Sequence, residues 1–430
     1  MNTEMTSTDQ PELAESRKPR EASDGARALS DGDYACERAA ALELQRNLLP
    51  RRLRGGIAVE AASRYLPADT EAGVGGDWFD VIPLSGARVA LVVGDVVGHG
   101  IDAAATMGRL RTAVRTLADL DLPPDELLRH LDDSVRRLID EDGDTPEQAP
   151  VMGATCLYAV YDPITRHCTM AQAGHLPPAI IDPHGHVTFP DLPTGAPLGL
   201  GLGLVPFEAV DVELPEGSLL ALYTDGLVES RDEDIDDGIH RLVATLAHPD
   251  QSLEDLCSSA MESLPARAPS DDITLLLVRI RTLNASQIAS WDLTTEPAVV
   301  RTARHLAARQ LSEWGLEHLV STTELVVSEL VTNAIRHGAG PIRLRLIQHN
   351  VLTCEVFDSG ICSPRVRHAR IIDENGRGLY MVAQVSRRWG FRSATEGKLV
   401  WVEQDLASAP AHSHGLCPPQ AADAHPARIA

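Results

Sequence analysis

The 430-residue chain has few aromatic residues and no long apolar run, and each of these shortages limits the classes of protein to which it can belong. No stretch of about 18 apolar residues occurs, so we expect no transmembrane helix. The N-terminal segment is polar and lacks the apolar core of a signal peptide, so a cytoplasmic location is expected. Because aromatic residues make up only 4% of the chain, its cores must be built from Ala, Leu, Val and Ile.

Charge and cysteine content exclude further classes. The formal net charge is −24, which argues against a nucleic-acid-binding or membrane-binding surface. Lys18 and Lys398 are the only lysines, and the other basic residues are arginine and histidine. The seven cysteines are scattered without a CxxC pair, which argues against a disulfide framework or a zinc site. At about 150 residues per domain, the length predicts two or three domains.

Both ends of the chain lack hydrophobic periodicity. Residues 1–30 are rich in Glu, Ser, Asp and Pro, and we predict that they are disordered. Residues 31–50 have a helical pattern that stops at Pro50 and are expected to form a linker helix. Residues 408–430 are rich in Ala, Pro and His and are expected to form a disordered tail.

Two patterned regions lie between these ends, at 57–281 and 290–406. The first alternates short strand patterns with two helical blocks, and the second combines three helical blocks with strand patterns. Such grouping predicts an α+β fold class with layered domains, one from each region. The helical blocks are expected at about 101–119, 124–140, 296–313, 319–337 and 377–386.

Four acidic motifs are spread over the first region. They read GGDWFD, GDVVGHG, YTDGLVES and SDDIT, and they supply Asp77, Asp95, Asp225 and the pair Asp271 and Asp272. Carboxylate oxygens are the ligands that Mg²⁺ and Mn²⁺ prefer. Two such ions about 3.5–4 Å apart can activate a water for in-line attack on a phosphoryl group. An Asp-Gly pair alone is a common turn, so the prediction depends on the four motifs occurring together.

These motifs, with GATCLYAVYD and AGHLPP, resemble the stage II sporulation protein E-type branch of the metal-dependent (PPM, type 2C) serine/threonine phosphatases. The resemblance covers residues 57–281 and implies a four-layer α-β-β-α sandwich with a site for two Mn²⁺ or Mg²⁺ ions. Asp272 is the weaker candidate for the fourth aspartate role. The metal ligands that the resemblance implies are Asp77, Asp95, the carbonyl of Val96, Asp225 and Asp271.

Two histidines and the linker helix accompany this prediction. His99 either caps the following helix or carries a proton, and His175 is expected to be structural. The helix at 31–50 resembles the regulatory linker that precedes such phosphatase domains. Control by a partner, or by homodimerisation through this helix, is therefore a hypothesis. Unchanged activity and oligomeric state after deletion of residues 1–50 would count against it.

The second region carries its own ordered set of polar residues and glycines. Glu329 and Asn333 are one helical turn apart; Asn offers an oxygen to Mg²⁺, and Glu can accept a hydroxyl proton. Asp358 ends a strand pattern and is suited to accept a hydrogen bond from an exocyclic amine such as adenine N6. The GRG of GRGLYMV precedes a helix, where backbone amides can bind phosphate. Because GRG alone is usually a plain turn, the prediction of a nucleotide site depends on these residues occurring together in this order.

The set ExxxN, DxG and GxG resembles the GHKL (Bergerat) ATPase superfamily over residues 290–406, and most of all the anti-sigma-factor serine kinases. The resemblance implies a two-layer α/β domain that binds ATP with Mg²⁺. Asn333 would bind Mg²⁺, Glu329 would act as the base, and Asp358 would contact adenine. Relatives often carry Thr at the position of Leu399, which predicts a lost hydrogen bond on the adenine side. The glycines implied at the nucleotide are Gly360, Gly376 and Gly378.

Together, the two regions predict a partner-switching regulator of sigma-factor activity. The phosphatase would remove phosphate from Ser or Thr of an anti-anti-sigma (STAS-domain) protein, and the kinase would restore it with ATP. A sigma factor is a second candidate partner. Three alternatives stay open: an ATP-holding binding module without kinase activity, a sensor-histidine-kinase remnant or general ATPase, and a scaffold with an inactive phosphatase.

Overall fold

The computed structural model describes most of both patterned regions. The predicted disordered ends, nearly all of the linker helix, His99 and Gly376 lie outside the described residues. Within the described residues, no helix is long and apolar enough to cross a membrane. The described ranges are 48–50, 52–68, 75–98, 100–142, 153–201, 206–230, 234–265, 269, 271–360, 378–394 and 397–407.

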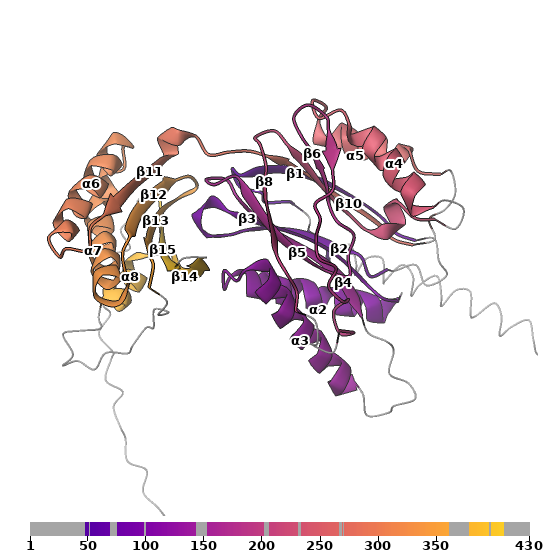
Figure 1. Cartoon of the computed structure of the whole chain (residues 1–430), viewed down its shortest axis with the longest axis horizontal. Coiled ribbons are helices and arrows are strands. Elements are labelled where there is room, and N and C mark those ends of the chain that lie inside the picture. The colour runs from indigo at the N-terminus through magenta and orange to yellow at the C-terminus, as the bar shows by residue number, and fades with distance from the viewer. Residues whose placement is uncertain are drawn as a thin grey trace, which may run out of the picture.

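Two five-stranded antiparallel sheets face each other in the first part of the chain (Figure 1). The first sheet contains β1 (Val59–Leu66), β10 (Ile273–Ile280), β9 (Leu219–Tyr223), β6 (Ala179–Ile181) and β7 (Val187–Thr188), in that spatial order. The second contains β2 (Trp78–Pro83), β3 (Val89–Val96), β4 (Ala154–Asp162), β5 (His167–Ala173) and β8 (Val210–Glu213). Leu91, Val92 and Val93 of β3 are fully buried because layers cover both sides of this sheet.

Helices form the two outer layers. The second sheet is covered by α2 (Ile101–Ala118) and α3 (Pro124–Asp142), and the first by α4 (Ile235–Leu246) and α5 (Leu253–Glu262). The four-layer α-β-β-α sandwich is therefore confirmed. We call these layers the first unit.

The prediction of only two helical blocks in the first unit is wrong, because α4 and α5 are also helices. Both are short, and both begin at a capping residue that could have revealed them. The Asp234 side chain accepts a hydrogen bond from the backbone N–H of Asp236, and that of Ser252 from the N–H of Asp255.

A third sheet and three helices form the second unit. The sheet has the order β11 (Ile288–Leu293), β12 (Ile342–Gln348), β13 (Val351–Asp358), β15 (Gly397–Asp405) and β14 (Arg388–Ala394), all antiparallel. One face packs against α6 (Val299–Glu313), α7 (Val320–His337) and α8 (Gly378–Val385). The predicted two-layer α/β arrangement is confirmed. The sequence did not reveal β14, whose run RWGFRSA contains two arginines.

Part of the other face of the third sheet contacts the first unit. The short helix η1 (Ser85–Ala87) in the β2–β3 connection lies against it. Ala87 packs with Leu283 and Ile347 in a small apolar cluster. Gly86 lies so close to Glu355 that an added Cβ would stand 2.6 Å from its Oε1. In Figure 1, β14 accordingly lies beside the end of α2.

A charged cluster centred on Arg392 joins the two units. The Arg392 guanidinium lies 2.9 Å from Glu355 Oε1 in its own sheet and 3.1 Å from Ser85 Oγ in the first unit. Asp121, after α2, accepts from Ser85 and pairs with Arg88, and its Oδ2 is 3.9 Å from Arg392. Since Glu355 is only 1% exposed, this cluster is a buried interface and not a surface ion pair.

Candidate functional site

The ends of four strands bring the acidic motifs together at one end of the sandwich. Asp77 immediately precedes β2, and Asp95 lies near the end of β3. Asp225 follows β9 in a short helix, η2 (Asp225–Leu227), and Asp271 and Asp272 precede β10. Because β2 pairs with β3 and β9 pairs with β10, the facing sheets place these carboxylates close enough to interact electrostatically.

The carboxylates resist ionising together. Burial, and then the charge of Asp95, raise the pKa of Asp77 well above its ordinary value. Burial, and then the charges of Asp225 and Asp271, raise the pKa of Asp95 to about 7. Burial also raises the pKa of Asp271. Such mutual repulsion is what a bound cation relieves.

The neighbours Asp271 and Asp272 have different surroundings. Asp272 is 1% exposed, and its two oxygens accept hydrogen bonds from the backbone N–H of Ala68 and the hydroxyl of Tyr65. Asp271 is exposed, and the charge of Asp225 contributes to its raised pKa. Asp272 is therefore engaged in holding the end of β1, whereas Asp271 is open to a ligand.

The Val96 carbonyl lies next to a glycine that the local geometry requires. A Cβ added to Gly76 would stand 2.2 Å from the Val96 oxygen, and the Val96 N–H donates to the Gly76 carbonyl at 3.2 Å. Any larger residue at position 76 would push the two segments apart. This close approach holds Val96 beside Asp77.

The donor set fits a hard divalent cation by its chemistry. All of its members are oxygens, which suits Mg²⁺ or Mn²⁺. In the part of the chain that the structure describes, no three acidic, His or Cys side chains already surround a single point. The fit therefore rests on the donor type and on the concentrated negative charge.

Two residues behind the carboxylates have larger roles than the sequence suggested. The fully buried Thr224 donates its hydroxyl to Asp77 Oδ2 at 2.6 Å and accepts from the N–H of Thr274. His175 lies 2.8 Å from the Thr155 hydroxyl through Nδ1 and 3.1 Å from the Tyr223 carbonyl through Nε2. Because Thr155 stands opposite Asp95 and Tyr223 comes shortly before Asp225, His175 ties the two sheets together beside the site.

Protonation of His175 should destabilise the fold. Burial lowers its pKa from 6.5 to about 4, so this residue contributes stability above pH 6.5 that is lost as the pH falls towards 4. The full shift corresponds to about 3 kcal/mol of unfolding free energy. Unfolding in urea from pH 7 to pH 4.5 should therefore show a smaller loss in His175→Gln than in the wild type. Equal losses would contradict the role of this residue.

Asp80 of the first acidic motif has a structural role. Its side chain is 1% exposed and pairs with Arg111 at 2.9 Å and Arg115 at 2.6 Å, both on α2. Arg111 also donates to the carbonyl of Leu48. Asp80 thus fixes α2 on the second sheet and links it to the chain segment that enters the first unit.

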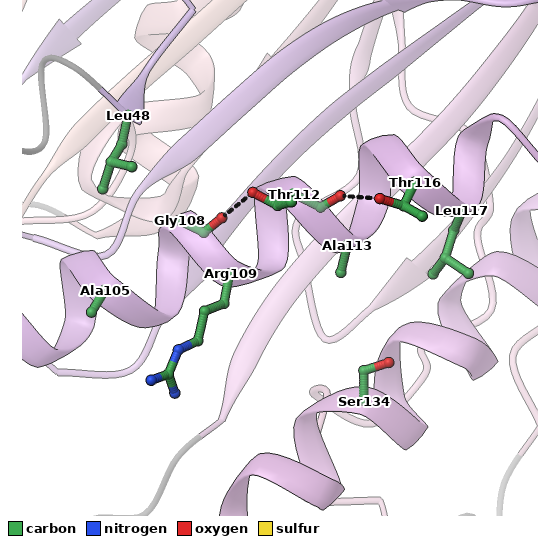
Figure 2. A pocket seen from close by; sticks show the side chains of 9 residues that line it. All are labelled: Leu48, Ala105, Gly108, Arg109, Thr112, Ala113, Thr116, Leu117 and Ser134. Atoms are coloured by element: carbon green, nitrogen blue, oxygen red, sulfur yellow. Dashed lines mark hydrogen bonds between the residues drawn. The ribbon is translucent and has the colours of Figure 1, made fainter. Parts of the chain in front are cut away.

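A shallow apolar groove runs along α2, and none of the four acidic motifs contributes a residue to its lining (Figure 2). Leu48 and Gly108 lie at one part of it and Leu117 and Ser134 at another. A Cβ added to Gly108 would stand 3.0 Å from the Leu48 side chain. The described end of the predicted linker helix therefore contacts α2, and its regulatory role stays a prediction.

The second unit brings its predicted residues together in two groups. A Cβ added to Gly378 would stand 2.0 Å from Glu329 Oε2, so the start of α8 lies against Glu329. Asp358, 1% exposed at the end of β13, accepts from the N–H of Gly360 at 2.9 Å. Asn333 lies half-buried one turn after Glu329 on α7.

The expected effect of Leu399 on the adenine side is not supported. Lys398 is the residue that pairs across the strands with Asp358, while Leu399 pairs with Phe357. Since successive strand residues point to opposite faces, Leu399 points to the sheet face opposite to that of Asp358. The Lys398 ammonium, which the sequence had not singled out, lies 3.0 Å from Asp358 Oδ1.

Comparisons with known proteins match both units. Residues 85–281 match the family Stage II sporulation protein E (SpoIIE), and residues 293–403 match the Histidine kinase-like ATPase domain. The chain is 27% identical over 255 residues to phosphoserine phosphatase RsbU of Bacillus subtilis. The matched residues cover 56% of this chain and 68% of RsbU. It is 25% identical over 251 residues to phosphoserine phosphatase RsbP of the same organism, covering 56% of this chain and 58% of RsbP.

One of the solved structures to which the chain is similar contains the RsbU and RsbW domains of Rv1364c from Mycobacterium tuberculosis. The sequence identity is 24% and the TM-score is 0.46, over 81% of this chain and 93% of that one.

Proposed function

Because the chain joins a SpoIIE-type phosphatase segment to a histidine-kinase-like ATPase segment, we propose that the first unit is a metal-dependent phosphoserine/phosphothreonine phosphatase. The observation that carries this proposal is the group of mutually repelling carboxylates at the strand ends. The residues that would hold the ions are Asp77, Asp95, the Val96 carbonyl, Asp225 and Asp271. When bound, Mn²⁺ or Mg²⁺ would neutralise their charge and supply an acidified water for attack on phosphorus.

The residues of the chain itself would orient this site. Thr224 fixes one oxygen of the Asp77 carboxylate. The neutral ring of His175 connects β4, whose Thr155 stands opposite Asp95, to β9, which ends shortly before Asp225. Because these contacts lie in the protein core, the carboxylates need little reorganisation when cations and substrate arrive. The exposed Asp271 leaves one side of the group open to a phosphorylated side chain.

The test is phosphate release from a serine-phosphorylated anti-anti-sigma (STAS-domain) protein, the partner class that the RsbU-like segment suggests. Full-length protein with Mn²⁺ should release phosphate, a chelator should stop the reaction, and excess Mn²⁺ should restore it. Absence of Mn²⁺-dependent release from both this substrate and phosphoserine peptides would overturn the proposal.

For the second unit we propose ATP–Mg²⁺ binding and a serine kinase activity that opposes the phosphatase on the same partner. Support comes from Glu329, which lies against the start of α8 with Asn333 one turn away. The regulator would then set the phosphorylation state of the partner and, through it, sigma-factor activity.

The alternative is a module that holds ATP and a partner without turnover. Glu329→Ala separates the two: a kinase should lose ATP-dependent phosphorylation of the partner and keep its binding. A binding module shows no turnover in the wild type and unchanged binding in the variant. An acid-labile phosphoryl group on the protein itself would instead indicate a histidine-kinase remnant.

A further inference from the structure

Asp358 is held by two donors that use the same oxygen. The Lys398 ammonium lies 3.0 Å from Asp358 Oδ1, and the Gly360 N–H donates to that oxygen at 2.9 Å. The ammonium also donates to the Gly360 carbonyl at 3.4 Å. Among the described residues both donors act on Oδ1, which leaves Oδ2 as the oxygen that can accept a hydrogen bond from a ligand.

Closely packed glycines surround this carboxylate. A Cβ added to Gly338, at the end of α7, would stand 2.3 Å from Asp358 Oδ1, and one added to Gly360 would stand 2.8 Å from it. A Cβ added to Gly397 would stand 2.2 Å from the Asp358 carbonyl. Backbone thus encloses the residue on three sides, and the carboxylate cannot rotate freely.

The cation at this position is a lysine in a chain whose other basic side chains are, apart from Lys18, arginine or histidine. An arginine fork tends to engage both oxygens of a carboxylate, whereas an ammonium is a point charge that can engage one. Lys398 is 8% exposed, so its charge acts on Asp358 with little solvent screening. A lysine here therefore holds the carboxylate without using Oδ2.

We propose that Lys398 is a positioning residue for purine recognition: by engaging Oδ1, it presents Oδ2 of Asp358 to the exocyclic amine of adenine. The inference rests on the proposed ATP site. It predicts that Lys398 governs the discrimination between purines with and without this amine, and not general nucleotide affinity.

The experiment compares ATP with purine riboside triphosphate, which lacks the amine, by calorimetry of the full-length protein with Mg²⁺. The wild type should bind ATP at least tenfold more tightly than the analogue. Lys398→Met should lose this preference, with weaker ATP binding and unchanged analogue binding. Lys398→Arg should lose it as well, because the fork occupies Oδ2.

Asp358→Asn and Arg387→Met complete the design. Asp358→Asn should lose the preference, and adding Lys398→Met to it should change nothing further. Arg387→Met is the control, because it removes an ion pair between two exposed side chains. Arg387 is 54% exposed and Asp405 is 62% exposed, and this variant should keep the preference for ATP.

Each contrary result has a distinct meaning. Wild-type preference in both Lys398 variants, or equal weakening of both ligands, would overturn the inference. Absence of ATP binding by the wild type would overturn the nucleotide site itself and the inference with it.

Discussion

Asp95→Asn should lower phosphatase activity about a thousandfold while making the metal-free protein more stable. The amide keeps the shape of the side chain and removes one negative charge from the carboxylate group. Metal-ion catalysis supplies several kcal/mol of transition-state stabilisation, and about 4 kcal/mol corresponds to a thousandfold in rate. Hydrolysis of p-nitrophenyl phosphate with Mn²⁺ measures this loss without requiring the natural partner.

The gain in stability follows from the raised pKa of Asp95. A carboxyl group whose pKa rises to about 7 on folding stabilises the fold below pH 3.8 and loses that contribution as the pH rises through 7. At pH 8 in the presence of a chelator, the free energy of unfolding of Asp95→Asn should therefore be about 1–2 kcal/mol higher than that of the wild type. This figure is reduced for solvent screening.

The matched control is Asp211→Asn, whose carboxylate is 51% exposed and forms hydrogen bonds with His167 and Thr169, which lie outside the acidic motifs. It should change neither activity nor metal-free stability. A fully active Asp95→Asn would remove Asp95 from the metal site. A less stable variant in the chelator would contradict the repulsion between the carboxylates.

Arg392→Met should destabilise the protein by about 3 kcal/mol and weaken the docking of the two units. Among the described residues, the substitution leaves Glu355, which is 1% exposed, with Arg345 at 3.5 Å as its remaining cation. Removing one partner of a buried ion pair costs about 3–5 kcal/mol, because the other charge stays desolvated. Since Arg345 remains, we expect the lower end, measured by denaturant unfolding.

The docking itself gives a second observable. In the wild type the two units should unfold together, whereas in Arg392→Met their transitions should separate, since the link to Ser85 and Asp121 is lost. Arg343→Met is the control, because its pair with Asp292 is exposed by 51% and 72%, and it should cost less than about 0.5 kcal/mol. Equal effects of both variants would contradict the buried interface.

Local patterns predicted much of the secondary structure. The strand pattern that ends in Asp358 predicted β13, and helical periodicity predicted α2, α3 and α7 to within a few residues. In these elements the side chains that decide the structure are near neighbours in the chain, so the period of the sequence is enough. The helices α4 and α5 differ in this respect, because they are short and the capping residues Asp234 and Ser252 mark where they begin.

Local sequence patterns were sufficient to predict the two-part organisation and the acidic and glycine motifs at the strand ends. The side chains that contact these motifs depend on the folded arrangement of the chain. Tyr65 engages Asp272 across 207 positions, Lys398 reaches Asp358 across 40, and Arg392 reaches Ser85 across 307. Such contacts follow from strand register and from the docking of one sheet on another unit. No local pattern encodes them, because burial and pairing exist only once the chain has folded.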